Sequence, residues 1–153
     1  MAGDLETKIK EYYKQVEGWL LWYNERRQEY LNTREAIIHS GGHSLPQAAG
    51  GQTEYSDPTG RKAEKLADIK YTEDWLKFVA DLENSISDEF KALLHLRRDY
   101  RFCRGRTGWT VALQRRYEEK TGYRVGGRST LHLWWRDLVN CATVLAAKKG
   151  LLQ

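Results

Sequence analysis

RGRTGWTVALQRRYEEKTGYRVGGRSTLHLWWRDLVNCATVLAAKKG, residues 104–150, predicts two helices joined by a turn rich in glycine. We expect Thr107 to cap the first helix and Gly122 to end it. We expect the second helix to start at Ser129 and to end at Gly150. Its apolar residues recur at steps of four and three, which is typical of a helix with one buried face. The predicted buried residues are Leu131, Trp135, Leu138, Ala142 and Leu145, with Trp134 beside them and Trp109 packing from the first helix.

The opposite face of this last helix carries short hydrogen-bonding side chains and one arginine, as a helix that reads base edges requires. We expect its first turns to enter the major groove of DNA. Arg136 suits a bidentate contact with guanine, and Leu133 suits a thymine methyl group. The predicted base-reading residues are Ser129, Thr130, His132, Leu133 and Arg136.

A second group of arginines surrounds the starts of both helices. Arginine matches phosphate geometry well, and phosphate contacts position a protein on DNA without reading its sequence. The predicted phosphate-binding residues are Arg104, Arg106, Arg115, Arg116, Arg124 and Arg128.

The distribution of charge supports this interpretation. Residues 1–96 hold 12 basic and 17 acidic residues, a net charge of −5, whereas residues 97–153 hold 13 basic and 4 acidic residues, a net charge of +9. The whole-chain charge of +4 conceals this difference. Part of the basic excess, from Arg97 to Arg104, ends a helix, where arginine also suits the negative end of the helix dipole.

The rest of the chain also predicts helices, so the expected fold class is all-α, with long aromatic N-terminal helices and a C-terminal unit of three helices that resembles a helix-turn-helix. Apolar steps of three and four indicate one long helix from Asp4 to about Ala36. A loop rich in glycine follows at 39–57. Pro58 then opens either one helix to about Ser85 or two helices with a bend near Tyr71. We expect an N-terminal region at 1–86 and a DNA-binding unit at 87–153.

Several classes of function are disfavoured. No phosphate-binding glycine loop, nucleophile elbow or HExxH pattern occurs in the sequence, so we expect that the protein is not an enzyme. We expect no metal and no cofactor, because the loop residues His39 and His43 have no cysteine beside them. Two cysteines, no membrane-length apolar run and no signal-peptide core in residues 1–10 favour a protein of the bacterial cytoplasm.

Three features resemble the RinA-type late transcriptional activators of phages that infect Gram-positive bacteria, which are related to the ArpU-type regulators. They are a tyrosine-rich first helix ending near Glu25-Arg26-Arg27, the segment SDPTGRKAEKLA at 56–67, and the order of the last three helices. The resemblance implies a C-terminal helix-turn-helix similar to the promoter-reading part of sigma factors. The connection from Gly122 to Arg128 is longer than the usual turn of ~3–4 residues, so it could instead form a small wing that touches the DNA backbone.

Two classes of function therefore stay open. One is a sequence-specific activator of phage late genes that binds double-stranded DNA and RNA polymerase. The aromatic residues of its N-terminal helix either pack on the helices that follow or form a homodimer surface, since aromatic residues are frequent at interfaces. The other is a DNA-packaging or assembly factor similar to a small terminase subunit, which would form a ring.

Overall fold

The computed structural model describes residues 2–40, 58–103 and 108–152, and every regular element in these ranges is helical. The predicted all-α fold is therefore confirmed. The helices are α1 (Ala2–Leu21), α2 (Tyr23–Ser40), α3 (Pro58–Asp68), α4 (Lys70–Ser85), α5 (Asp88–Asp99), α6 (Trp109–Thr121) and α7 (Arg128–Lys148), with a short 3-10 helix, η2, at Arg101–Cys103.

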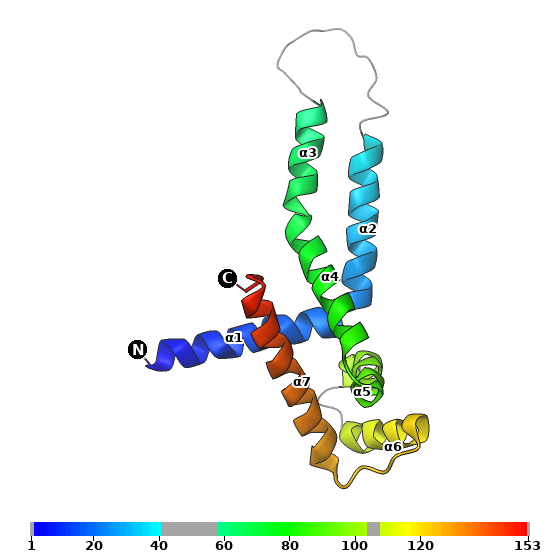
Figure 1. Cartoon of the computed structure of the whole chain (residues 1–153). Coiled ribbons are helices and arrows are strands. Elements are labelled where there is room, and N and C mark those ends of the chain that lie inside the picture. Colours follow the sequence, from blue (N-terminus) through cyan, green and yellow to red (C-terminus); the bar gives the residue numbers. More distant parts are fainter. Residues whose placement is uncertain (1, 41–57, 104–107, 153) are drawn as a thin grey trace.

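The first helical stretch bends sharply, which corrects the prediction of one helix from Asp4 to Ala36. The helical run is interrupted at Trp22, and Figure 1 shows α1 lying across the molecule while α2 turns upward. The carbonyl of Leu20, next to the bend, accepts a hydrogen bond of 2.8 Å from Nε of Arg98 on α5. A buried arginine therefore satisfies a carbonyl at the end of α1, where the helix leaves such groups without partners.

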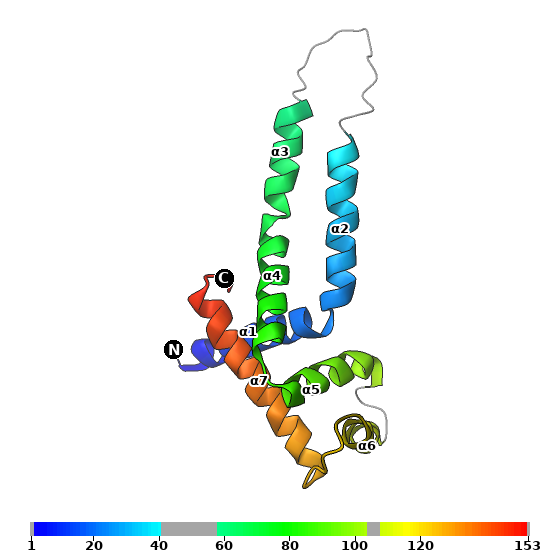
Figure 2. The same ribbon diagram turned by 45° about the vertical axis from the view of Figure 1, so that its right-hand side comes forward.

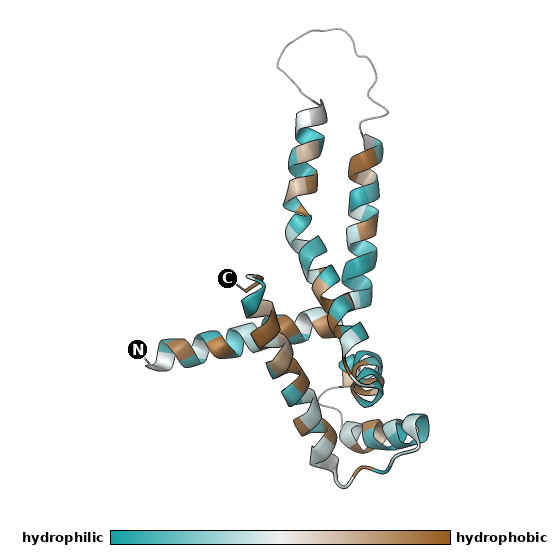
Figure 3. Cartoon of the chain, in the orientation of Figure 1, coloured by the Kyte–Doolittle hydropathy of each residue, from teal (hydrophilic) through white to brown (hydrophobic). Residues whose placement is uncertain are grey.

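After the bend, α2 runs beside α3 and α4, and the three helices form a hairpin that projects from the rest of the molecule, as both Figure 1 and Figure 2 show. The stretch that begins at Pro58 forms two helices and not one, because a break at Ile69 separates α3 from α4. Little apolar surface is buried along the outer part of the hairpin, where Ile37 is buried and Leu66 is half-buried. Its ribbon is mostly hydrophilic in Figure 3.

The core lies where α1, α4, α5, α6 and α7 meet. A single cluster of buried side chains joins these helices, and it is unusually aromatic. Trp19 and Trp75 stack with their ring centres 5.2 Å apart, and Tyr117 and Trp135 are almost fully buried. The cluster includes residues from both predicted regions, 1–86 and 87–153, and the division between them stays a prediction.

Local signals at helix ends account for several of the boundaries. Ser87 caps α5 as its residue type predicts, because its Oγ accepts the backbone amide of Phe90 at 3.4 Å. Gly122 ends α6 in the left-handed conformation, with φ of +78°. Beyond α7, Gly150 has φ of +74°, and the amide of Leu151 returns to the carbonyl of Ala146 at 3.0 Å. No helix in the described ranges is long and apolar enough to cross a membrane.

Candidate nucleic-acid interface

The predicted reading helix, α7, buries most of the face that its sequence pattern indicates. Leu131, Trp135, Leu138 and Ala142 are all buried. The prediction that Leu145 is buried is wrong, because 37% of this residue is exposed. Ala146 is buried in its place. The predicted stripe follows a 3.5-residue repeat, and a helix of 3.6 residues per turn drifts away from such a repeat along its length.

The opposite side of the first turns of α7 is open to solvent. Ser129, His132, Leu133 and Arg136 are exposed, and Thr130 is half-buried. The ring of His132 meets the ring of Trp109 on α6 at a centre distance of 6.1 Å, so His132 also links the two helices. All five predicted base-reading residues therefore reach the surface at least in part.

Two details differ from the prediction for this helix. Helix α7 begins at Arg128 with Gly127 as its N-cap, and no side chain caps it, so Ser129 is not the capping residue. Asp137 is exposed between the predicted contacts at Leu133 and Arg136 and the next turn at Asn140. A carboxylate there repels phosphate, and it limits the part of α7 that suits DNA to the turns before Asp137.

The predicted phosphate-binding arginines fall into two groups. Arg115, Arg116 and Arg124 are exposed on α6 and on the turn that follows it. Arg116 also approaches the carboxylate of Glu119 at 3.6 Å, a surface pair in which both side chains are mostly solvated. Arg104 and Arg106 lie outside the described residues, and so does the side chain of Arg128.

The turn between α6 and α7, residues 122–127, is fixed to α6 through Val125. That residue is buried, its amide hydrogen-bonds Oε1 of Glu118 at 3.4 Å, and its carbonyl accepts Nε2 of Gln114 at the same distance. Tyr123 and Arg124 stay exposed on either side of this anchor, Tyr123 by 63%. The turn therefore presents an aromatic side chain and a cation outward from a fixed backbone.

Figure 1 shows that α6, the turn and the start of α7 lie together at one end of the molecule. The hairpin of α2, α3 and α4 projects from the opposite end. Exposed arginines thus lie on α6 and on the turn, and exposed polar side chains lie on the first turns of α7. The helix-turn-helix interpretation of α6 and α7 itself stays a prediction.

The arginines at the end of α5 do not belong to this surface. Arg97 and Arg98 are 5% and 6% exposed, and each faces a carboxylate from an earlier helix, Glu17 of α1 or Glu83 of α4. The distances are 3.9 Å from Arg97 to Glu17 and 3.4 Å from Arg98 to Glu83, and Arg101 pairs with Glu25. Without these three arginines, residues 97–153 retain ten basic and four acidic residues, a net charge of +6.

Aromatic rings complete the surroundings of these three arginines, which we call the corner arginines because they surround the bend between α1 and α2. The guanidinium of Arg97 lies 5.2 Å from the ring centre of Trp109 and 4.8 Å from that of Trp135. Arg101 lies 4.7 Å from the ring of Trp22. Cation–π contacts gain strength when they are desolvated. The density of aromatic residues in the first helix was the one sequence signal that could have indicated this role.

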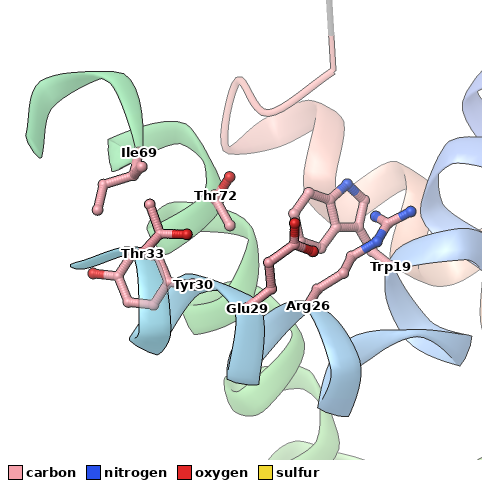
Figure 4. Close-up of a pocket in the computed structure, with 7 residues that line it drawn as sticks. All are labelled: Trp19, Arg26, Glu29, Tyr30, Thr33, Ile69 and Thr72. Carbon is pink, nitrogen blue, oxygen red and sulfur yellow. The ribbon is translucent and has the colours of Figure 1, made fainter. Parts of the chain in front are cut away.

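A cavity of about 320 Å³ opens at the base of the hairpin. Figure 4 shows Arg26 lying over Trp19, with the guanidinium 4.3 Å from the ring centre. Burial lowers the pKa of Arg26, while the nearby Glu29 acts in the opposite direction. We assign no ligand to this cavity, because Glu29 balances the charge of Arg26. Its lining residues are Trp19, Arg26, Glu29, Tyr30, Thr33, Ile69 and Thr72.

Comparison with known proteins finds no matching family model, no matching curated protein and no matching solved structure. The resemblance to RinA-type activators therefore rests on the sequence features quoted above.

Proposed function

We propose that this protein binds double-stranded DNA in a sequence-specific manner and activates the late genes of a phage, those for packaging and morphogenesis. The observation that carries the proposal is that α6, the 122–127 turn and the first turns of α7 meet at one end of the molecule and hold exposed arginines and polar side chains. We define this DNA-binding surface by Arg115, Arg116, Arg124, Ser129, Thr130, His132, Leu133 and Arg136.

The two parts of this surface have different tasks in the proposal. The first turns of α7 enter the major groove, where Arg136 and Leu133 meet base edges. Arg115, Arg116 and Arg124 lie outside the groove and neutralise phosphates. The amides at the start of α7, which no side chain caps, face the same backbone and attract phosphate oxygens.

The remaining parts of the molecule support this task. The corner arginines hold α1 and α2 against α5, and α5 in turn packs against α6 and α7. The projecting hairpin lies away from the proposed DNA surface, which leaves it accessible to RNA polymerase while DNA is bound. Polymerase contact is assigned to the acidic N-terminal part of the chain by exclusion, because DNA binding is assigned to the basic C-terminal part.

The proposal is tested by titrating the full chain into fluorescent duplex DNA at several salt concentrations. We expect binding whose logarithm falls linearly with the logarithm of salt concentration, with a slope of about −0.9 for each phosphate neutralised. Sequences selected from a random duplex pool should bind at least ~10³-fold more tightly than unselected DNA at physiological salt. Absence of binding at ~50 mM salt would refute the proposal.

A mass measurement on the complex separates this function from DNA packaging. A promoter-binding activator gives one or two copies per DNA site. A ring of many copies that forms around DNA would favour the packaging factor similar to a small terminase subunit.

A further inference from the structure

The apolar stripe of α1 continues beyond the part of the helix that the core covers. Its residues follow a spacing of four and three from Leu5 through Ile9 and Tyr12 to Val16 and Trp19. Val16 and Trp19 are 0% and 8% exposed, whereas Leu5 and Ile9 are 63% and 56% exposed. Figure 1 shows the reason, because the first half of α1 extends past α7, the helix that crosses it.

A groove lies on the same helix next to these exposed residues. It has a volume of about 270 Å³ and is lined by Ile9, Lys10, Tyr13, Lys14 and Glu17. Tyr13 is partly buried against the core, so the groove has a fixed wall. An aliphatic side chain flanked by acidic residues would match this apolar groove with lysines at its rim.

We propose that the first half of α1 binds the first half of α1 of a second copy of this chain, with the two helices antiparallel. Leu5 is the side chain that fits the groove of the second copy, and Asp4 and Glu6 flank it. The exposed rim of the groove carries Lys10 and Lys14, whereas its third charged residue, Glu17, is buried and pairs with Arg97. The acid at Asp4 and the exposed rim therefore carry opposite charges.

The antiparallel direction follows from the order of charges along α1. A two-fold axis at Ile9 sets Leu5 of one copy opposite Tyr13 of the other and Asp4 opposite Lys14, while Lys8 and Lys10 face each other beside the axis. Both copies make the same contacts, as a two-fold interface requires. In a parallel pair, by contrast, the acidic residues would face each other and the lysines would face each other, and such like-charge pairing is costly.

The contact is small, because each copy contributes about three turns of helix. It falls below the ~1,200–2,000 Å² that stable protein interfaces bury. We therefore expect a reversible dimer with a dissociation constant of roughly 10–100 µM, the range of a weak complex. When both copies bind one DNA site through their DNA-binding surfaces, the DNA holds them close together and so strengthens the dimer.

The first test uses sedimentation velocity of the full chain without DNA, from about 5 to 300 µM, a span chosen around the expected dissociation constant. We expect the wild type to change from monomer to dimer, and the double variant Leu5→Asp with Ile9→Asp to stay a monomer at every concentration. Leu31→Asp is the control, because it also adds an acid at an exposed leucine, 37% exposed, on the hairpin helix α2. That control should dimerise like the wild type.

The second test uses charge reversal and does not depend on the apolar residues. Asp4→Lys with Glu6→Lys gives one variant, and Lys10→Glu with Lys14→Glu gives the other. Each alone should be monomeric, whereas an equimolar mixture should form a heterodimer. Both variants lose the pair between Glu6 and Lys10 within α1, 3.8 Å in the wild type, so the loss of that pair cannot explain restored binding in the mixture.

The proposal is overturned if the wild type stays monomeric to ~300 µM, or if the Leu5 and Ile9 variant dimerises normally, at concentrations where a weak interface would be populated. A mixture of the two charge variants that stays monomeric overturns it as well. Circular dichroism and melting of each variant check that the fold is intact. These tests contain no DNA, so a failure of the proposed DNA binding leaves them interpretable, and the reverse also holds.

Discussion

Nε of Arg98 donates a hydrogen bond of 2.8 Å to the backbone carbonyl of Leu20, which lies 78 positions earlier in the chain. This bond joins the end of α5 to the bend between α1 and α2. The same guanidinium meets the carboxylate of Glu83 on α4 at 3.4 Å and lies 5.2 Å from the ring centre of Tyr23. One side chain therefore holds three helices in their relative positions.

Replacing Arg98 should destabilise the fold strongly. Arg98→Met leaves the Leu20 carbonyl without this donor and Glu83 without its buried cation, so we expect a loss of about 3 kcal/mol in the free energy of unfolding. Urea denaturation measures the change. Arg116→Ala, an exposed arginine in a solvated pair, is the control, and it should change stability by less than ~0.5 kcal/mol. Equal effects of the two substitutions would show that Arg98 does not hold the corner.

The end of α6 gives a matched pair of glycine substitutions. Gly122 has φ of +78°, whereas Gly126 in the same turn has no positive φ and no neighbouring atom within 4 Å of the position that a Cβ would occupy. Gly122→Ala should therefore cost about 1–2 kcal/mol, because a side chain is strained in the left-handed conformation. Gly126→Ala should be neutral or slightly stabilising. Thermal melting of the two variants compares them, and an equal loss in both would contradict the role of backbone conformation.

Low pH should reduce the stability of the fold by protonating Glu83. Burial raises the pKa of this carboxyl, but its hydrogen bond with His95 and the charge of Arg98 outweigh burial, so the pKa lies below its ordinary value. The folded state thus favours the ionised form more than the unfolded chain does. The resulting stabilisation is fully present above the unfolded pKa of about 4.3, and it is lost as pH falls through the folded pKa.

Glu83→Gln should accordingly reduce the dependence of stability on pH in the acidic range. We expect the difference in urea midpoint between wild type and variant to be largest near pH 6 and to shrink as the pH falls below about 4.3. Midpoints measured at several pH values test this. A difference that stays constant across the range would mean that the titration of Glu83 is not linked to folding.

Two arginines of the proposed DNA surface should behave differently on replacement. Arg136→Ala should weaken the free energy of DNA binding by about 1–3 kcal/mol, and it should relax the choice of base at one position of the site. Arg124→Ala should weaken all sequences alike and reduce the salt slope by about 1. Fluorescence anisotropy with selected and random duplexes measures both effects. Arg34→Ala, at an exposed arginine on the hairpin, is the control and should change neither quantity.

Equal losses on selected and random DNA for Arg136→Ala would contradict its assignment to base reading. A corner arginine should behave differently from both, because it is engaged inside the protein. Its replacement should lower the free energy of unfolding. The dependence of DNA affinity on salt concentration, measured on the folded variant, should stay nearly unchanged.

The local sequence was sufficient to predict the helices and most of the faces that they bury. Spacings of three and four correctly indicated that Leu131, Trp135, Leu138 and Ala142 of α7 are buried. These predictions succeed because the burial of a helical face follows from the local period of its apolar residues.

The bend of the first helix and the role of the α5 arginines depend instead on contacts between distant helices. The pattern from Asp4 to Ala36 is continuous, and nothing within it marks Trp22 as a corner. Arg98 of α5 hydrogen-bonds the carbonyl of Leu20 beside the bend, and these two residues are 78 positions apart. A run of arginines has the same local appearance whether it faces phosphate or buried carboxylates, because its surroundings come from other helices.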